Sequence, residues 1–324
     1  MEKRKILIIS PFRDTDIERI KKSVSADFEI KHFVNELTND ELKKEITDAE
    51  IIVGQPPLEL IADVKNCPRL KFLQITWAGT DMYTAGTITF PKNRIILANS
   101  SGVYGIIMSQ YAIGMILSIM LRFKEYHNQQ QKKVWERRGP VQSLDHAKVL
   151  VFGAGDIGTA VAKRLSGFDA YCIGVCRNTA KKRNYFKELC TLSEAEKYIS
   201  DSDVIIGCLP NTSETKGYFN LQRLSLMKKT AVIINVGRGN FIDCMALDKL
   251  LREDKILGAA LDVTNPEPLP PNHPLWDNPR CMITPHTSGA TFGHLEKTES
   301  ALTDLICENL RRYSNNEELI NRVL

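Results

Sequence analysis

The sequence lacks the features that mark several large classes of protein. Its 19 glycines in 324 residues cannot occupy every third position, so a collagen triple helix is excluded. Hydrophobic residues make up 43% of the chain, which is too apolar for an intrinsically disordered protein. Basic residues number 43 and acidic residues 39, so no nucleic-acid-binding surface is expected. What remains is an ordinary globular composition, and the length predicts about two domains.

The eight cysteines include no C-x-x-C pair. Several lie in apolar runs, as Cys208 does within residues 205–209. Such cysteines are typical of buried thiols. The sequence therefore predicts neither a metal site nor a disulfide framework.

Long apolar runs are also scarce. The one membrane-like stretch covers residues 105–121, but two serines and a glutamine interrupt it. It also falls short of the roughly 20 apolar residues that a membrane span needs, so a buried or subunit-contact helix is the favoured interpretation. The N-terminal apolar run ends at Pro11 and is too short for a signal-peptide core. We therefore expect a cytoplasmic protein without a membrane partner.

Strand-like and helix-like segments alternate along the chain in two series. The first series has strand-like segments at 5–9, 28–33, 51–53, 70–75 and 95–98, with helices at 14–24 and 38–46. The second has strand-like segments at 148–152, 171–175, 204–208, 231–235, 259–263 and 282–284, with helices at 157–165, 245–251 and 291–313. This alternation predicts two mostly parallel sheets that are covered on both faces.

A long helix is expected between the two series, from about Tyr104 to Lys133. Its first half is apolar on nearly every side, and its second half is charged and rich in glutamine. A helix of this character is typical of a bridge between domains or of a dimer contact.

The segment at 153–158 has the pattern G-x-G-x-x-G between a predicted strand and a predicted helix. In that context Gly153 permits the tight turn, Gly155 lets the backbone approach a pyrophosphate, and Gly158 lets the helix pack on the strand. Backbone N–H groups at the helix N-terminus would bind the pyrophosphate. A ligand-free glycine-rich turn is the less favoured alternative. The predicted dinucleotide site comprises Gly153, Ala154, Gly155, Asp156, Ile157 and Gly158.

The end of the next strand indicates which dinucleotide binds. NAD sites usually carry an acid there, about 20 residues on, to bind the ribose 2′-hydroxyl. Here the residues are Cys176, Arg177, Asn178 and Thr179. A carboxylate would repel a 2′-phosphate, whereas an arginine with two hydrogen-bonding side chains would bind one. Residues 177–183 hold four basic residues and no acid. We therefore predict NADP(H) in preference to NAD(H), which stays possible; some of these basic side chains are expected to be simply solvated.

Three polar residues follow strands of the second series, at the sheet edge where such folds place their sites. They are Arg238, Glu267 and His286. An arginine can bind a carboxylate in bidentate fashion, and a histidine can donate a proton to a carbonyl oxygen. A glutamate bonded to that histidine would fix its orientation and favour its charged form. Each residue alone has an ordinary structural explanation, but together they predict a site that reduces 2-oxo acids.

With these motifs the chain resembles the D-isomer-specific 2-hydroxyacid dehydrogenase family. The resemblance covers residues from about 70 to 313. It is carried by the segments 153–158, 209–217, 235–243, 260–263, 266–268, 273–276 and 284–286. It implies that Arg238 binds the substrate carboxylate and carbonyl, that His286 is the acid–base residue, and that Glu267 is its partner.

The resemblance also implies further site residues. The cofactor pocket would include Leu209, Pro210, Val236, Gly237, His286 and Asp262, the last as an auxiliary carboxylate near the nicotinamide. The loop of Trp77, Ala78, Gly79 and Thr80 would offer backbone N–H groups to the substrate carboxylate. NAD-dependent members carry an acid where Cys176 stands, which supports NADPH here.

The fold class implied is α/β, with two Rossmann-like domains around a cleft. Residues 1–100 and 290–324 would form a flavodoxin-like substrate domain, and residues 101–289 a doubly wound NAD(P)-binding domain. The resemblance further implies a homodimer, built partly on the long helix, and closure of the domains to exclude water from the reaction.

The expected substrate is a small 2-oxo or 2-hydroxy acid. The loop at 54–57 offers no basic residue for a substrate phosphate. A glyoxylate or hydroxypyruvate reductase is the first expectation, and a reductase of larger, branched 2-oxo acids is the second. A nucleotide-sensing, corepressor-like interaction protein on the same fold is the alternative from another class. A formate dehydrogenase is disfavoured, because it would carry a glutamine where Glu267 stands.

Overall fold

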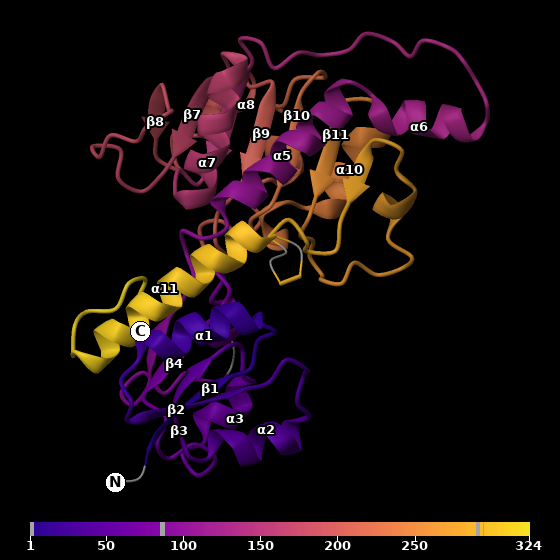
Figure 1. Cartoon of the computed structure of the whole chain (residues 1–324). Helices are drawn as coiled ribbons and strands as arrows, with labels where there is room; N and C mark the ends of the chain where they lie inside the picture. Colours follow the sequence, from indigo (N-terminus) through magenta and orange to yellow (C-terminus); the bar gives the residue numbers. More distant parts are fainter. Residues whose placement is uncertain (1–2, 85–87, 290–291, 294) are drawn as a thin grey trace. The chain divides into compact units, whose positions relative to one another are not determined.

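The computed structural model describes residues 3–84, 88–289, 292–293 and 295–324 (Figure 1). The chain forms two compact units, residues 1–103 with 290–324 and residues 104–289. Each unit contains one parallel β-sheet with helices packed on it. The predicted α/β class with two such sheets is confirmed.

The first unit, which we call unit 1, has a five-stranded sheet in the order β2-β1-β3-β4-β5. Its strands are β1 (Arg4–Ile8), β2 (Phe28–His32), β3 (Ala49–Val53), β4 (Phe72–Gln74) and β5 (Ile96–Ala98). Its helices are α1 (Asp14–Ser23), α2 (Asn39–Ile46), α3 (Leu58–Ala62), α4 (Asp81–Thr84) and α11 (Glu296–Ser314). The strand order is that of flavodoxin-like sheets, as predicted.

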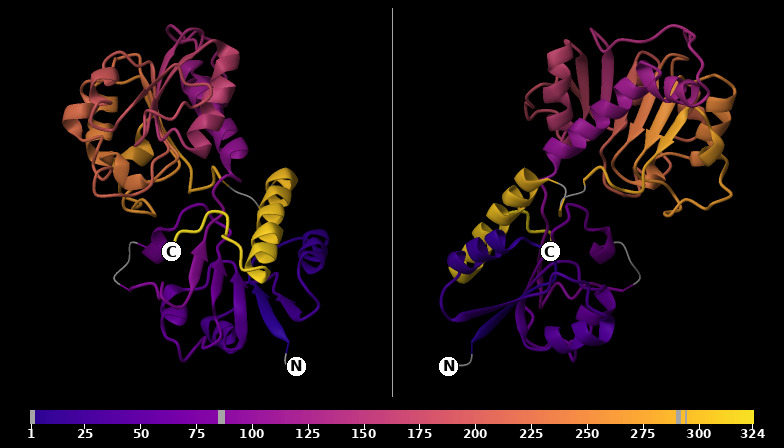
Figure 2. Two further views of the ribbon diagram at one scale, coloured as in Figure 1. Left: turned by 90° about the vertical axis from the view of Figure 1, so that its left-hand side faces the viewer. Right: turned by 45° about the vertical axis from the view of Figure 1, so that its right-hand side comes forward.

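Helix α11 belongs to unit 1 although it comes last in the chain. It lies beside α1 (Figure 2), and Asn309 on it donates a 2.7 Å hydrogen bond to the buried Gln74 of β4. The sequence predicts this helix over 291–313, whereas it begins at Glu296. Residues 290, 291 and 294 lie outside the described part of the chain.

The second unit, unit 2, has a seven-stranded sheet in the order β12-β11-β10-β9-β6-β7-β8. Its strands are β6 (Lys148–Phe152), β7 (Tyr171–Val175), β8 (Glu188–Cys190), β9 (Val204–Gly207), β10 (Val232–Asn235), β11 (Gly258–Leu261) and β12 (Cys281–Ile283). Its α-helices are α5 (Gly105–Met120), α6 (Phe123–Gln131), α7 (Asp156–Leu165), α8 (Glu196–Ile199), α9 (Leu221–Leu224) and α10 (Cys244–Arg252). The strand order reverses between β6 and β9, and doubly wound sheets bind their ligands outside such a point.

The single long helix that the sequence predicts from Tyr104 to Lys133 is wrong in one respect. It is two helices, α5 and α6, which meet at an angle of 65°. Arg122, between them, has a left-handed backbone with φ of 60°, which ends the first helix. Its guanidinium donates to Glu125 at 2.6 Å and to the carbonyl oxygen of Pro140 at 2.9 Å. Among the described residues no single helix is long and apolar enough to cross a membrane; only this bent pair reaches that length and composition.

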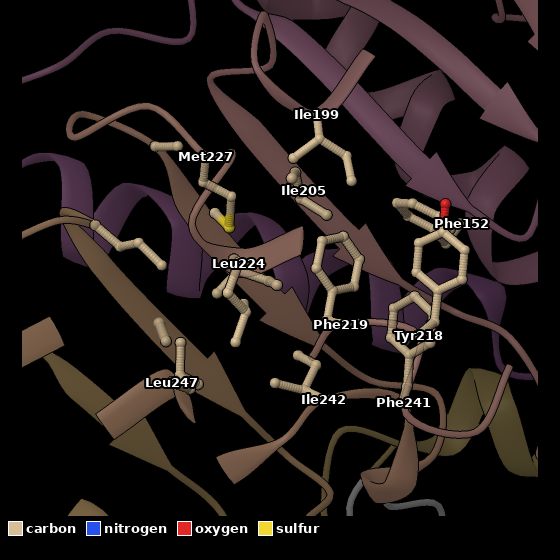
Figure 3. Close-up of a cluster of buried hydrophobic side chains, with 14 of the residues drawn as sticks. Phe152, Ile199, Ile205, Tyr218, Phe219, Leu224, Met227, Phe241, Ile242 and Leu247 are labelled. Atoms are coloured by element: carbon tan, nitrogen blue, oxygen red, sulfur yellow. The ribbon is translucent and has the colours of Figure 1, made fainter. Parts of the chain in front are cut away.

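Both faces of the unit 2 sheet are covered by apolar side chains. Helices α5 and α7 pack on one face, and the cluster in Figure 3 fills the other. In that cluster the rings of Phe152, Phe219 and Phe241 meet edge to face, with centroids 5.2 Å apart in each pair. Phe152 directly precedes the glycine motif and Phe241 closely follows Arg238. The cluster therefore fixes two of the segments that carry predicted site residues.

Most of the cysteines are buried free thiols, as the sequence predicts. All eight are free, and Cys67, Cys172, Cys190, Cys244 and Cys281 are buried. The other three are partly exposed. Burial raises the pKa of the Cys281 thiol to about 12, so this thiol stays protonated at neutral pH.

Candidate active site

The predicted site residues of unit 2 lie on segments that leave one edge of its sheet. All strand pairs of this sheet are parallel, so the segments after β6, β7, β9, β10, β11 and β12 emerge at the same edge. These segments carry the glycine motif and Cys176 to Thr179, Leu209 and Pro210, Val236 to Arg238, Asp262 and Glu267, and His286. Tertiary structure thus brings them to one edge.

His286 and Glu267 form the predicted pair. The Nδ1 atom of His286 lies 2.6 Å from Oε1 of Glu267. The two side chains are 51% and 43% exposed, so a substrate can reach them. The backbone of His286 is left-handed, with φ of 54°, and its N–H donates to the carbonyl oxygen of Asp262 at 2.8 Å. Because Glu267 occupies Nδ1, the opposite ring nitrogen, Nε2, is the one placed for proton exchange.

Asp262 anchors the loop that carries His286. Its side chain is buried, and Oδ1 accepts hydrogen bonds from Thr284 Oγ1 at 2.6 Å and from the N–H of Thr287 at 2.8 Å. Its Oδ2 accepts from the N–H of Ser288 at 2.9 Å. The contacts assign this carboxylate a role in holding the loop. Its expected place beside the nicotinamide stays a prediction.

The turn that carries Arg238 is held by its own strand and by a neighbouring segment. The buried Asn235 accepts from the N–H of Gly237 at 3.1 Å and donates to the carbonyl oxygen of Arg238 at 2.9 Å. On the other side, a Cβ on Gly239 would lie 1.8 Å from the carbonyl oxygen of Thr264. The packing therefore requires glycine at position 239, and the two hydrogen bonds of Asn235 stabilise the turn. Asn235 is a supporting residue that the sequence analysis did not assign, although it opens the Asn-Val-Gly-Arg-Gly motif.

The three glycines of the motif meet different surroundings. Gly153 has φ of 105°, and a Cβ on it would lie 2.8 Å from the carbonyl oxygen of Cys208. A Cβ on Gly158 would lie 2.0 Å from the carbonyl oxygen of Gly153. Around Gly155, in contrast, the described residues place no heavy atom within 4 Å of the added Cβ, apart from its chain neighbours and the backbone of its own helix. The chain's own packing therefore requires glycine at 153 and 158, and leaves open space at 155.

This open space fits a bound pyrophosphate. Gly155 is the N-cap of α7, and as a glycine it contributes no side-chain cap to this helix end. A helix N-terminus without a side-chain cap presents backbone N–H groups to an anion, and the helix dipole favours negative charge there. Residues 153–158 are therefore suited to hold the diphosphate of a dinucleotide.

Alanine at Gly155 and alanine at Gly158 should have opposite effects. Gly158→Ala forces a methyl group into a backbone oxygen, and we expect it to destabilise the fold by about 3 kcal/mol, the upper end of the usual range for overpacking. Gly155→Ala should keep the wild-type melting temperature but weaken NADPH binding at least tenfold. Thermal melts and fluorescence titration with NADPH measure both. Wild-type NADPH affinity in Gly155→Ala would contradict the pyrophosphate assignment.

The segment after β7 contains the predicted ribose-phosphate residues. The thiol of Cys176 donates to the carbonyl oxygen of Asn178 at 3.3 Å, and Asn178 Oδ1 accepts from the N–H of Ala180 at 3.0 Å. The main-chain oxygen and Oδ1 of Asn178 thus both stabilise the turn in which this residue lies. Arg177 is exposed, and no carboxylate of the described residues forms an ion pair with it. A guanidinium in this state remains available to an anionic ligand.

In unit 1 the predicted substrate loop follows β4. The indole of Trp77 is 51% exposed. The carbonyl oxygen of Trp77 accepts from the N–H of Ser100 at 2.9 Å, and that of Ala78 accepts from Asn99 Nδ2 at 2.7 Å. These bonds fix the loop within its own unit. Carboxylate binding by its N–H groups stays a prediction.

Within the described parts of the chain, no group of three or more His, Cys, Asp or Glu side chains could hold a metal ion.

Residues 113–288 match the family model described as D-isomer specific 2-hydroxyacid dehydrogenase, NAD binding domain. The chain belongs to this family.

Members of the D-isomer-specific 2-hydroxyacid dehydrogenase family resemble this protein in sequence or structure over most of its length. A glyoxylate/hydroxypyruvate reductase A of Photorhabdus laumondii is 32% identical over 276 residues, 82% of this chain and 83% of the relative. A family protein from Aeromonas salmonicida superposes with a TM-score of 0.87 at 29% identity, covering 99% of each chain. An NADPH-dependent glyoxylate/hydroxypyruvate reductase from Sinorhizobium meliloti, solved with citrate, has a TM-score of 0.77 at 26% identity and covers 99% of this chain and 98% of its own.

Membership in the family makes this chain an NAD(P)-dependent oxidoreductase. It thereby confirms the general class of reaction that Arg238, Glu267 and His286 predict. Besides Asn235, the sequence analysis did not assign Thr284, which donates to Asp262, or Tyr111, whose hydroxyl is hydrogen-bonded to Thr284. A hydroxyl residue next to a Pro-His pair is a weak signal for Thr284. No signal marks Tyr111, which lies within the apolar helix α5.

Proposed function

We propose that this protein reduces glyoxylate, hydroxypyruvate or a similarly small 2-oxo acid to the D-2-hydroxy acid, with NADPH as reductant. The observation that carries the proposal is the 2.6 Å contact between His286 and Glu267, at the sheet edge that also bears Arg238. The Photorhabdus relative named glyoxylate/hydroxypyruvate reductase supports the choice of substrate. In this assignment residues 101–289 bind the dinucleotide and residues 1–100 with 290–324 bind the substrate.

The roles follow from the chemistry of the side chains. Bound NADPH supplies the hydride equivalent that the carbonyl carbon receives. The guanidinium of Arg238 binds the carboxylate and the carbonyl oxygen of the substrate, because its donor fork matches two acceptor oxygens. His286 donates the proton from Nε2 to the carbonyl oxygen, which becomes the new hydroxyl group. Glu267 holds the ring through Nδ1 and so fixes the orientation of Nε2 for that transfer.

Three observations support NADPH over NADH. The segment after β7 has no carboxylate at Cys176 to Arg183, where an NAD site would place one. Arg177 is exposed without an ion-pair partner among the described residues. The Sinorhizobium relative is described as NADPH-dependent. A 2′-phosphate would supply the acceptor oxygens for this guanidinium.

The proposal is tested by following NADPH oxidation against a panel of 2-oxo acids. The panel contains glyoxylate, hydroxypyruvate, pyruvate and the branched 2-oxo acids that correspond to valine and leucine. We expect the highest kcat/KM with one of the first two. Greater activity with a branched acid would favour the alternative substrate class. Failure to reduce any acid, with intact NADPH binding, would favour a nucleotide-sensing interaction protein.

We further propose that the protein works as a homodimer in the cytoplasm. Large apolar side chains are exposed on α6 and the segment that follows it: Phe123, Tyr126, Val134, Trp135 and Val141. The indole of Trp135 is fully exposed, and a second copy of the chain would cover such a surface. Eight free thiols fit a reducing compartment. Sedimentation of Trp135→Ser tests the dimer, with Trp276→Ser as an exposed control; a wild-type sedimentation profile would contradict a contact at Trp135.

A further inference from the structure

One face of helix α5 supports the loop that carries His286. Tyr111 on α5 makes a 2.6 Å hydrogen bond between its hydroxyl and Thr284 Oγ1, at the start of the loop. At the other end of the loop, a Cβ on Gly289 would lie 3.6 Å from Tyr104 and 3.7 Å from Met108. Residues 104, 108 and 111 are spaced i, i+4 and i+7, so they share one face of the helix. The loop from 284 to 289 thus lies beside this face at its second end and is hydrogen-bonded to it at its first residue, Thr284.

The direction of the hydrogen bonds follows from the groups involved. The one hydroxyl proton of Thr284 is donated to Asp262 Oδ1 at 2.6 Å, where the carboxylate oxygen is the acceptor. The oxygen of Thr284 therefore accepts the proton of Tyr111. Burial raises the pKa of Tyr111 to about 12, so this hydroxyl keeps its proton at neutral pH. The chain of donors runs from Tyr111 through Thr284 to Asp262.

The carboxylate at the end of this chain determines where His286 lies. Asp262 also accepts from the N–H groups of Thr287 and Ser288, and its main-chain oxygen accepts from the N–H of His286. The residues on both sides of His286 are therefore tied to Asp262. His286 itself has a left-handed backbone, which costs free energy in a residue other than glycine and persists only where its surroundings hold it.

We propose that Tyr111 is a positioning residue for His286 and acts through Thr284 and Asp262. This inference rests on the proposed role of His286 as the proton donor. Without the Tyr111 hydroxyl, Thr284 loses a donor, and the loop gains freedom at its first residue. The imidazole would then spend less time in the geometry that proton transfer requires. NADPH binding at the glycine motif depends on other residues and should not change.

The test compares Tyr111→Phe with matched variants. We expect kcat of Tyr111→Phe to fall about tenfold, because a small misplacement of a reacting group is costly, while the NADPH dissociation constant and the melting temperature stay near wild type. Thr284→Val should lower kcat by the same factor, whereas Thr284→Ser, which keeps the hydroxyl group, should retain the wild-type kcat. The double variant Tyr111→Phe with Thr284→Val should be no slower than either single variant. Tyr218→Phe removes the hydroxyl of another buried tyrosine of unit 2 and should leave kcat unchanged. Each kcat is calculated per active site, and the concentration of active sites is measured by NADPH titration.

A second measurement does not depend on activity. The chain has six histidines, so the imidazole resonances can be assigned by single substitutions. The resonance of His286 should shift in Tyr111→Phe and Thr284→Val, and stay in place in Thr284→Ser and Tyr218→Phe. An unmoved resonance, or full kcat in Tyr111→Phe while His286→Gln is inactive, would overturn the inference alone. An inactive wild-type enzyme would overturn the proposed function, and the resonance would still decide the role of Tyr111.

Discussion

Replacing His286 with glutamine should lower kcat for 2-oxo acid reduction by about a thousandfold, within the range that general acid catalysis contributes. Glutamine retains a hydrogen-bonding side chain of similar size, but its amide cannot donate a proton that the carbonyl oxygen would keep. NADPH binding should be nearly intact, because the diphosphate depends on residues 153–158. Steady-state kinetics and fluorescence titration separate the two quantities.

A matched control for this variant lies elsewhere in unit 2. His146 is exposed and its Nε2 lies 3.6 Å from Asp145, so it is a second histidine with a carboxylate neighbour. His146→Gln should leave kcat unchanged. Glu267→Gln keeps the shape of the partner of His286 and removes its charge, so kcat should fall by an intermediate factor of about 10 to 100. Loss of NADPH binding in His286→Gln, with kcat preserved at saturating cofactor, would show that the residue serves the cofactor and not the proton.

Reversing the charge at Arg177 should change the choice of cofactor. Arg177→Asp removes a donor from a 2′-phosphate and adds a repelling carboxylate. Because one hydrogen bond to a charged group contributes about 1.5–3 kcal/mol, the ratio of kcat/KM for NADPH to that for NADH should fall about 10- to 150-fold. The acid would also accept hydrogen bonds from the ribose hydroxyls of NADH, as acids at this strand end do in NAD sites. Kinetics with each cofactor at a fixed 2-oxo acid concentration measure this ratio.

Lys255→Asp is the control for this charge reversal. Lys255 is exposed and lies shortly before β11, at the opposite edge of the same sheet. It changes the net charge by the same amount as Arg177→Asp. Equal loss of NADPH preference in the two variants would indicate a general electrostatic effect. An unchanged preference in Arg177→Asp would show that another residue binds the 2′-phosphate or that none does.

The sequence could predict the elements that depend on neighbours along the chain. Strand β6, the glycine turn and the start of α7 follow from ten or so consecutive residues, because backbone conformation and periodicity are local properties. The break between α5 and α6 is also local, yet no glycine or proline marks it. Arg122 takes a left-handed conformation there and is held by Glu125 and Pro140, a contact that hydrophobic periodicity does not encode.

The candidate site likewise combines residues that the sequence predicts with supporting contacts that it does not predict. The types and order of Arg238, Glu267 and His286 predict a reductase, because each follows a strand and parallel strands end at one edge. The residues that hold these side chains in place carry weaker sequence signals. Asn235 braces the Arg238 turn from within a motif, whereas Tyr111 lies in a helix whose composition indicates only burial. Short strand β8 also escaped prediction, since three residues carry too little pattern.

The sequence by itself determined the family, the α/β class, the dinucleotide motif and the absence of an acid after β7. Each of these depends on residue type and on spacing along the chain. Only the tertiary structure decided that Glu267 meets His286 across 19 residues and that Tyr111 meets Thr284 across 173. It also decided that Asp262 holds the loop and that Gly155 alone of the three motif glycines faces open space. Such contacts depend on strand order, register and helix placement, which bring together side chains that are far apart in the sequence.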